Sequence, residues 1–144
     1  MKNYAPYIGI VFVLGVLWYA GFFREETLPP INPVVWETKT DDQADVTVTV
    51  TPRVLSLQSR GWKFDIILNT HSVELDQDML SVVVLVDDAG TEYKPARFEG
   101  AGPGGHHREG ILAFESIMPP PQHVTLKVRN IGNVERTFSW TLIE

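Results

Sequence analysis

The sequence predicts a mainly β protein: an immunoglobulin-like antiparallel β-sandwich of about seven strands, preceded by one N-terminal transmembrane helix. Three observations lead to this prediction. Residues 4–23 contain no charged side chain. Residues 46–144 contain short runs that alternate apolar and polar side chains or are rich in β-branched residues, and turn residues separate these runs. The predicted organisation is an anchor over residues 1–23, a proline-rich acidic stalk over 24–45 and a sandwich over 46–144.

The uncharged N-terminal run is long enough to cross a lipid bilayer. As a helix, residues 4–23 would rise roughly 30 Å, the thickness of the hydrocarbon core, so the bilayer itself is the first expected partner. A cleaved signal peptide is the alternative, but its apolar run is shorter, and Trp18 stands two residues before Ala20, the one candidate cleavage residue. Lys2 precedes the run, so we expect the C-terminal domain to lie outside the cytoplasm.

Prolines and acids mark the segment between the anchor and the sandwich. Residues 24–45 contain three prolines, and six acidic side chains against two basic ones. Prolines favour extended backbone, so this segment is predicted to be a semi-rigid spacer. The apolar triplet at 34–36 has a second interpretation, as a first edge strand packed onto the domain.

Strands are expected throughout the rest of the chain, and no further helical period is found. The Val/Thr alternation at 46–51 is typical of a half-buried strand, and the apolar run at 80–86 is typical of a central one. Pro95 places its strand at a sheet edge. Trp62 and Trp140 are expected in the core, with a ligand-stacking platform as the alternative at Trp62. The predicted strands are 46–51, 62–69, 80–86, 91–98, 110–116, 124–130 and 136–142.

Composition and motif context exclude several classes of function. The 144 residues include no cysteine, which excludes disulfides, thiolate metal sites and a cysteine nucleophile. The net charge of −6 gives no basic patch for a nucleic acid. Residues 100–105 match G-x-G-x-x-G, but a strand follows instead of the helix that a dinucleotide site needs. Ser72 directly follows His71, which is not the geometry of a catalytic triad, so we expect no enzymatic activity.

One glycine-rich loop, residues 100–110, contains the adjacent residues His106 and His107. If the predicted strands alternate in direction, this loop lies at the same end of the sandwich as His71, together with the loop between the last two strands. His123 then belongs to the opposite end. The sequence therefore predicts that three of the four histidines gather at one end.

Three kinds of role are open for this end: metal binding, cross-linking of the loops, and contact with an anion or a protein partner. Neutral imidazoles near carboxylates suit Zn²⁺ or Cu²⁺. The acidic segment 74–78 suits Ca²⁺ instead, but lacks the spacing of a calcium loop. Alternatively, the histidines, Arg108 and Glu109 cross-link the loops through free backbone groups, or contact an anion or a protein partner. The candidate metal ligands are His71, His106 and His107.

Two stretches, 68–75 and 98–114, resemble a pattern in small, uncharacterised bacterial extracytoplasmic domains, with the Pro-Gly-Gly-His-His-Arg sequence at 103–108 as its core. The resemblance implies a β-sandwich and a location in the cell envelope, and it carries no catalytic role. The predicted function is a single-pass, membrane-anchored recognition or scaffold domain that presents its Gly/His-rich loop end to a membrane or envelope protein. The alternative is an envelope accessory domain that binds zinc or copper.

Overall fold

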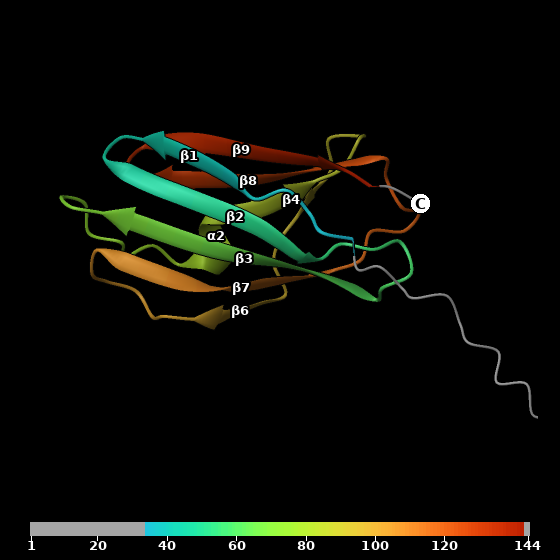
Figure 1. Ribbon diagram of the computed structural model, residues 1–144, viewed down its shortest axis with the longest axis horizontal. Coiled ribbons are helices and arrows are strands. Elements are labelled where there is room, and N and C mark those ends of the chain that lie inside the picture. Colours follow the sequence, from blue (N-terminus) through green and yellow to red (C-terminus); the bar gives the residue numbers. More distant parts are fainter. Residues whose placement is uncertain (1–33, 143–144) are drawn as a thin grey trace, which may run out of the picture. The chain divides into compact units, whose positions relative to one another are not determined.

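Two antiparallel sheets pack face to face in the part of the chain that the structure, a computed structural model, describes, residues 34–142 (Figure 1). One sheet has five strands in the order β1-β2-β3-β7-β6 and the other has four in the order β5-β4-β8-β9. The prediction of a mainly β antiparallel sandwich is therefore confirmed. The strands are β1 (Lys39–Gln43), β2 (Val46–Val54), β3 (Gly61–Thr70), β4 (Val83–Val86), β5 (Glu92–Tyr93), β6 (Arg97–Gly100), β7 (His107–Glu115), β8 (His123–Ile131) and β9 (Val134–Thr141), with one short helix, α2 (Met79–Val82).

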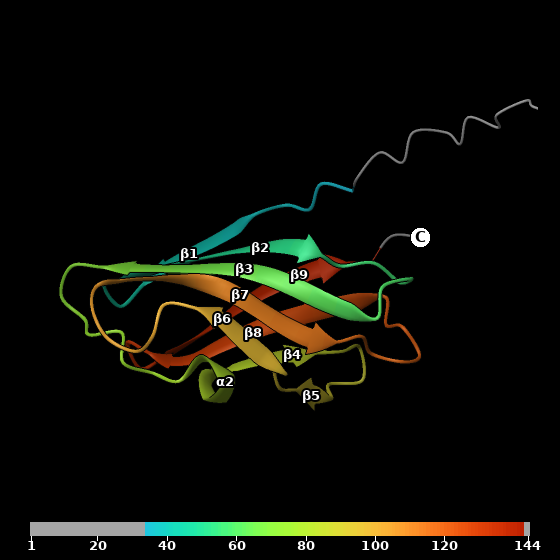
Figure 2. The same cartoon turned by 90° about the horizontal axis from the view of Figure 1, so that it is seen from below.

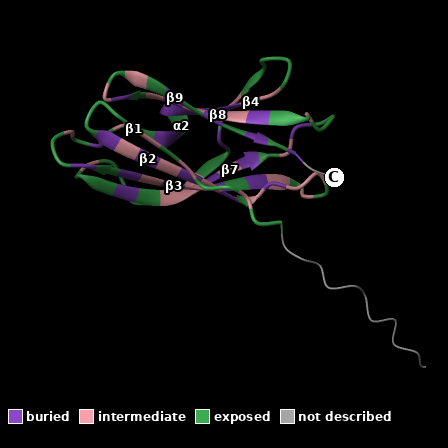
Figure 3. Cartoon of the chain, turned by 45° about the horizontal axis from the view of Figure 1, so that its top comes forward, coloured by how far each residue is buried: buried purple, intermediate pink, exposed green. Residues whose placement is uncertain are grey.

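The core forms because alternate residues of the long strands are buried between the two sheets, and Figure 3 shows buried residues recurring along these strands. In β2 the valines are buried and the threonines between them face outward. Phe64 of β3 packs edge-on against Phe114, with ring centroids 5.8 Å apart, and against Trp140 of the opposite sheet at 5.5 Å. Trp62 is only 1% exposed and its indole N–H donates to the carbonyl of Ser56, so this side chain is a core residue with no face free for stacking.

The first part of the predicted strand at 80–86 is helical. Residues 79–82 form the single turn of α2, and only Val83–Val86 join the sheet as β4. The cause is local: the Asp78 carboxylate accepts from the backbone N–H of Leu80 and from the hydroxyl of Ser81, which caps a helical turn. Tertiary context and this cap outweigh the β-branched composition of the run.

The predicted strand at 91–98 is split between the two sheets. Its first part is β5, at the edge of the four-stranded sheet, and its last part is β6, at the edge of the five-stranded sheet. Pro95 lies between them and has no N–H to donate to a ladder, so the chain leaves one sheet there and joins the other. The predicted edge position is correct for both pieces.

The sandwich begins before residue 46. Strand β1, which falls within the predicted stalk, pairs antiparallel with β2 from Lys39 opposite Val50 onward. Trp36 packs against the core without being part of a strand. Residues 24–33 of the predicted stalk and the predicted anchor over 4–23 lie outside the described residues. Within residues 34–142, no helix has the length and hydrophobicity needed to cross a membrane.

The two ends of the sandwich differ in what they carry (Figure 2). The loop end comprises the turns and loops at 44–45, 71–78, 101–106 and 132–133. The stalk end comprises 34–38, where the described chain starts, with the loops at 55–60, 87–91 and 116–122. Val35–Glu144 is one compact unit, and every buried core residue of the described chain belongs to it, so this part carries its own core.

Asp88 links two loops of the stalk end. Its carboxylate accepts from the backbone N–H groups of Gln122 and His123 and lies 3.2 Å from His123 Nδ1. Partial desolvation raises the pKa of Asp88, but these hydrogen bonds outweigh it and hold the pKa below its ordinary value. The carboxylate therefore contributes stability that is fully present above pH ~4, the pKa range of an unfolded aspartate, and is lost as the pH falls through the lowered pKa.

Replacing Asp88 with asparagine is expected to lower the melting temperature at neutral pH and to reduce the loss of stability between pH ~4 and ~2, because the titrating group is gone. Melting curves of Val35–Glu144 across this pH range measure both effects. Glu115→Gln at the same end is the control, since Glu115 is exposed. Equal melting temperatures and equal acid slopes for Asp88→Asn and the parent protein would contradict the role assigned to Asp88.

Candidate functional site

Backbone hydrogen bonds join the two loops that carry the histidines. The N–H of Thr70 donates to the carbonyl of His106 at 3.0 Å, and the N–H of Leu75 donates to that of Gly105 at 3.0 Å. The N–H of Gly104 returns a bond to the carbonyl of Leu75 at 2.8 Å. The predicted shared end is therefore present, although the strand count differs. Strands β5 and β6 both run toward the loop end, so the split of one predicted strand leaves the alternation unchanged.

Arg108 fastens the same loops from inside. Its side chain is 2% exposed, and its Nη1 donates to the carbonyls of Leu75 and Gln77 at 3.0 and 2.7 Å. Its Nη2 donates to the carbonyl of Ala101 at 3.3 Å, and the ring of Phe98 lies 5.8 Å from its Cζ. The cross-linking interpretation of Arg108 thus fits the structure. Its contact with an external anion or partner does not, because the guanidinium is buried.

Burial also acts on the charge of Arg108. Desolvation lowers the pKa of its guanidinium, while the nearby carboxylates of Asp78 and Asp76 raise it. Both carboxylates belong to the segment 74–78 that the sequence suggested for calcium. Here the segment instead supplies the carbonyl acceptors for Arg108 and the cap of α2.

A second buried arginine was not identified from the sequence. Arg136 is 1% exposed, and its Nη1 donates to the carbonyl of Ile131 at 2.7 Å. Its Nη2 donates to the carbonyls of Gln43 and Val46, and its Nε lies 3.1 Å from Asp41 Oδ1. Arg136 therefore joins the β8–β9 turn to the β1–β2 turn. The sequence did hold a signal, since Arg136 is in phase with the inward-facing side chains of β9.

His107 lies on the outer face of the five-stranded sheet. Its Nδ1 is 2.5 Å from Asn69 Oδ1 on the neighbouring strand β3, and its Nε2 is 3.7 Å from Glu109 Oε2. The side chain is 56% exposed. Glu109, predicted with Arg108 as a cross-link or partner contact, is likewise exposed, and its carboxylate faces His107 of its own strand.

His106 and His71 have other surroundings. His106 Nε2 is 4.0 Å from Glu74 Oε2, and the Glu74 carboxylate also accepts from the N–H of Gly105 at 2.6 Å. His71 lines a separate polar cavity. Within residues 34–142, no three His, Asp or Glu side chains are grouped so that they could hold a metal ion. The loop end thus brings the three histidines to one surface, where Asn69 contacts His107 and also lines the cavity of His71, while His106 faces Glu74.

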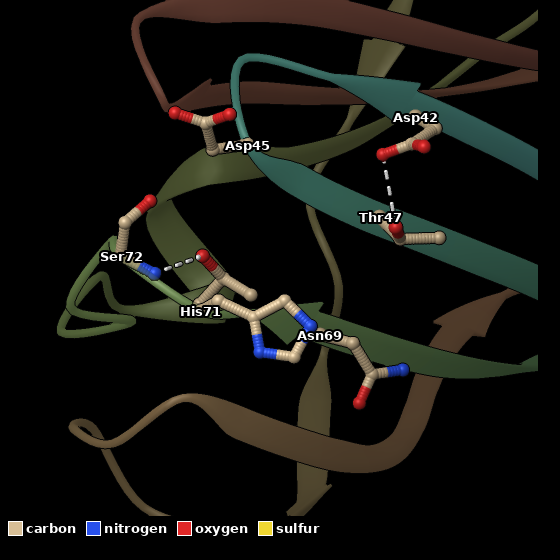
Figure 4. A pocket seen from close by; sticks show the side chains of 7 residues that line it. Asp42, Asp45, Thr47, Asn69, His71 and Ser72 are labelled. Carbon is tan, nitrogen blue, oxygen red and sulfur yellow. Dashed lines mark hydrogen bonds between the residues drawn. The ribbon is translucent and has the colours of Figure 1, made fainter.

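The cavity beside His71 has a volume of about 340 Å³ (Figure 4). One wall is the β1–β2 turn, where Ala44 and Asp45 have φ of 51° and 59°, the left-handed values that a two-residue hairpin turn requires. All the lining side chains are polar, so the cavity suits a small hydrogen-bonding group of a partner. They are Asp42, Asp45, Thr47, Asn69, Thr70, His71 and Ser72.

The surface charge is negative at the loop end and at the strand residues that border it. Its two arginines, Arg108 and Arg136, are buried and donate to backbone carbonyls, so neither presents its charge to solvent. The acidic side chains around them are exposed. These are Asp42, Asp45, Glu74, Asp76 and Glu109.

At Gly110 the backbone of β7 lies so close to β6 that there is no room for a side chain. A Cβ atom there would lie 2.5 Å from the ring of Phe98 and 2.7 Å from the carbonyl oxygen of Glu99. We expect Gly110→Ala to lower the free energy of unfolding by about 2 kcal/mol, because the Phe98 ring must leave its place over Arg108. Urea denaturation of Val35–Glu144 measures the change. Gly102→Ala is the matched control, since a Cβ there meets nothing within 4 Å. Equal effects of the two substitutions would contradict the packing described.

Comparison with known proteins gives one structural likeness. No family model matches the chain, and no curated protein matches it. Among solved structures, the chain is similar to MPT63, a secreted protein from Mycobacterium tuberculosis, with 18% sequence identity and a TM-score of 0.42. The match covers 74% of this chain and 91% of MPT63.

Proposed function

We propose that this protein is a single-pass, membrane-anchored recognition domain of the cell envelope, without enzymatic activity, whose immunoglobulin-like sandwich presents its loop end to a protein partner. The observation that carries the proposal is the construction of that end. The loops at 71–78 and 101–106 are fastened to each other by backbone bonds and by the buried Arg108, while imidazoles and carboxylates remain exposed around them.

A fixed surface of this kind favours recognition. Side chains on loops that are already ordered lose less conformational freedom on binding than side chains on mobile ones. The exposed groups of the loop end are carboxylates, imidazoles and backbone amides, so the complementary partner surface is basic. The described chain starts at the opposite end, with residues 34–38, so a tether there leaves the loop end accessible.

In-membrane cross-linking tests the proposal. A Gly102→Cys variant carries one thiol, because the chain has no other cysteine, and a photoreactive maleimide on it samples the loop end. We expect one discrete adduct in membranes of the source cells, reduced when Glu74 and Asp76 are both replaced by lysine. The matched control is Thr137→Cys, exposed on the four-stranded sheet. No adduct, or the same adducts from both positions, would overturn the proposal.

Metal binding by His71, His106 and His107 is the alternative that the sequence suggests, but residues 34–142 hold no group of three His, Asp or Glu side chains placed to bind one ion, which does not favour it. We therefore expect calorimetric titration with Zn²⁺ or Cu²⁺ to give the same result for the parent protein and for the His106→Ala/His107→Ala variant, with no one-to-one binding in either. A stoichiometric heat that the double variant abolishes would support the accessory metal-binding function instead. A melting temperature lowered without any metal would identify the two histidines as structural.

A further inference from the structure

We infer that the outer face of the five-stranded sheet binds a basic, extended segment of the protein partner, which lies along β3 from the loop end toward Asp65. A lysine or arginine of this segment lays its alkyl stem on Ile67 and Ile111 and directs its charge to Glu109. The inference rests on the proposed function and deepens it, because it names the chemistry of the partner and extends the contact from the loops onto the strands.

A hollow of about 610 Å³ lies on this face, over β2, β3, β7 and β6, which Figure 1 shows side by side. Ile67 and Ile111 line it and are half-buried, and they point outward because Ile66 and Leu112 beside them belong to the core. Carboxylates line the hollow as well, those of Asp65, Glu99 and Glu109. Apolar side chains beside carboxylates suit an alkyl chain that ends in a cationic group.

The polar cavity beside His71 belongs to the same face. Asn69 lines that cavity and Ile67 lines the hollow. Residues two apart on a strand point to the same side of its sheet, so these two side chains lie roughly 7 Å apart along β3. An extended segment that follows β3 therefore reaches both the cavity and the hollow.

The outer face is negative when every Asp, Glu, Lys and Arg on it is counted. The outward positions of the five strands and the β1–β2 turn hold six acidic side chains against three basic ones. With histidine counted as neutral, the net charge of the face is −3. The acids are Asp42, Asp45, Asp65, Glu99, Glu109 and Glu115, and the bases are Arg53, Lys63 and Arg97.

The excess negative charge lies toward the loop end. The three bases belong to the half of the face nearer the stalk end, and two of them form ion pairs there, Arg53 with Asp65 at 3.0 Å and Arg97 with Glu99 at 2.7 Å. In the half nearer the loop end, the described strands present Asp42, Asp45 and Glu109 and no outward lysine or arginine. A cationic side chain there meets carboxylates that no arginine of the face already pairs.

This charge distribution decides between the possible occupants. Anionic lipid and nucleic acid are repelled by an acidic face. A second copy of this chain, with its net charge of −6, brings the same sign of charge. Residues 24–33 of the chain itself contain one base and two acids, so they do not supply a basic segment. A basic segment of a different protein is the occupant that fits.

In-membrane cross-linking from the outer face tests the inference in the full chain. Thr49→Cys places the one thiol of the chain opposite Ile67, and it carries the same photoreactive maleimide as Gly102→Cys. We expect both positions to give the same adduct in membranes of the source cells. The partner peptide attached at position 49, sequenced by mass spectrometry, should contain at least two lysines or arginines.

Matched substitutions in the Thr49→Cys chain test the two halves of the recognition. Glu109→Gln should lower the yield of the adduct by about threefold, while Glu115→Gln, which removes the same charge from the same strand outside the hollow, should not. Ile67→Thr/Ile111→Thr keeps the β-branched shape and removes apolar surface, so it should lower the yield as well. Melting curves confirm that each variant is folded.

Each contrary result has its own meaning. An adduct at position 102 with none at 49 would overturn the inference and leave recognition by the loop end standing. An adduct at 49 on a segment without basic residues, on a lipid or on a glycan, or equal yields from Glu109→Gln and Glu115→Gln, would overturn the basic segment as the occupant. No adduct at either position would overturn the proposed function together with the inference.

Discussion

Arg108→Met will lower the free energy of unfolding of Val35–Glu144 by about 3 kcal/mol, the range found when a buried hydrogen-bonding group is removed and its partners stay buried. Methionine fills much of the same volume, so the loss comes from the carbonyls of Leu75, Gln77 and Ala101, which then lack their donor. Urea denaturation measures the loss, and hydrogen exchange of residues 101–107 reports the loosening of the loop.

Arg129→Met is the control for Arg108. Arg129 also makes several charged contacts, with Glu92 and Glu135, but its side chain is 32% exposed on the outer face of the four-stranded sheet. Removal of such a surface network costs about 1 kcal/mol or less. If the two substitutions cost the same, or if the exchange rates of the loop amides do not change in Arg108→Met, Arg108 does not hold the loop end together.

Arg136→Met is expected to cost a similar amount, about 3 kcal/mol, and to act on the opposite side of the loop end. Arg136 is the link between β9 and the carbonyls of Gln43 and Val46, and it faces the Asp41 carboxylate of β1. Without the Arg136 guanidinium, the Asp41 carboxylate loses its ion-pair partner, and the carbonyls of Gln43 and Val46 lose their hydrogen-bond donor. We therefore expect the amides of β1 to exchange faster in the variant than in the parent protein.

Arg53→Met provides the comparison for Arg136, because Arg53 of β2 pairs with Asp65 of β3 on the exposed face of the five-stranded sheet, to which β1 also belongs. Its removal should leave β1 protected and change stability little. Retention of parental exchange rates in β1 of Arg136→Met would show that pairing with β2 alone is enough to hold this strand.

The sequence predicted best where a side chain's environment depends on its own strand. The Val/Thr alternation of β2 and the inward Trp62, Phe64 and Trp140 follow from a period of two, and the structure has them as expected. The shared loop end also followed, because it depends only on alternating strand directions. The split of one predicted strand into β5 and β6 did not change this prediction, because both strands run toward the loop end.

Features that depend on specific partners were harder to predict. The Asp78 cap turned part of an apolar run into α2, and Pro95 moved the chain from one sheet to the other. The burial of Arg108 and Arg136 could not be predicted from the sequence, for a further reason. Their acceptors are backbone carbonyls, which every residue has, so no residue type in the surrounding sequence marks the pairing.

Because Arg108 and Arg136 donate to backbone carbonyls, the side chains of the loop end can vary between related sequences. Both arginines bind main-chain oxygens of the turns, so the scaffold depends on the path of the loop backbone and not on most of the side chains it displays. Residues such as Gly102 and His71 are then free to change without weakening the supports beneath them. Specificity at the loop end can evolve, or be engineered by grafting, separately from folding.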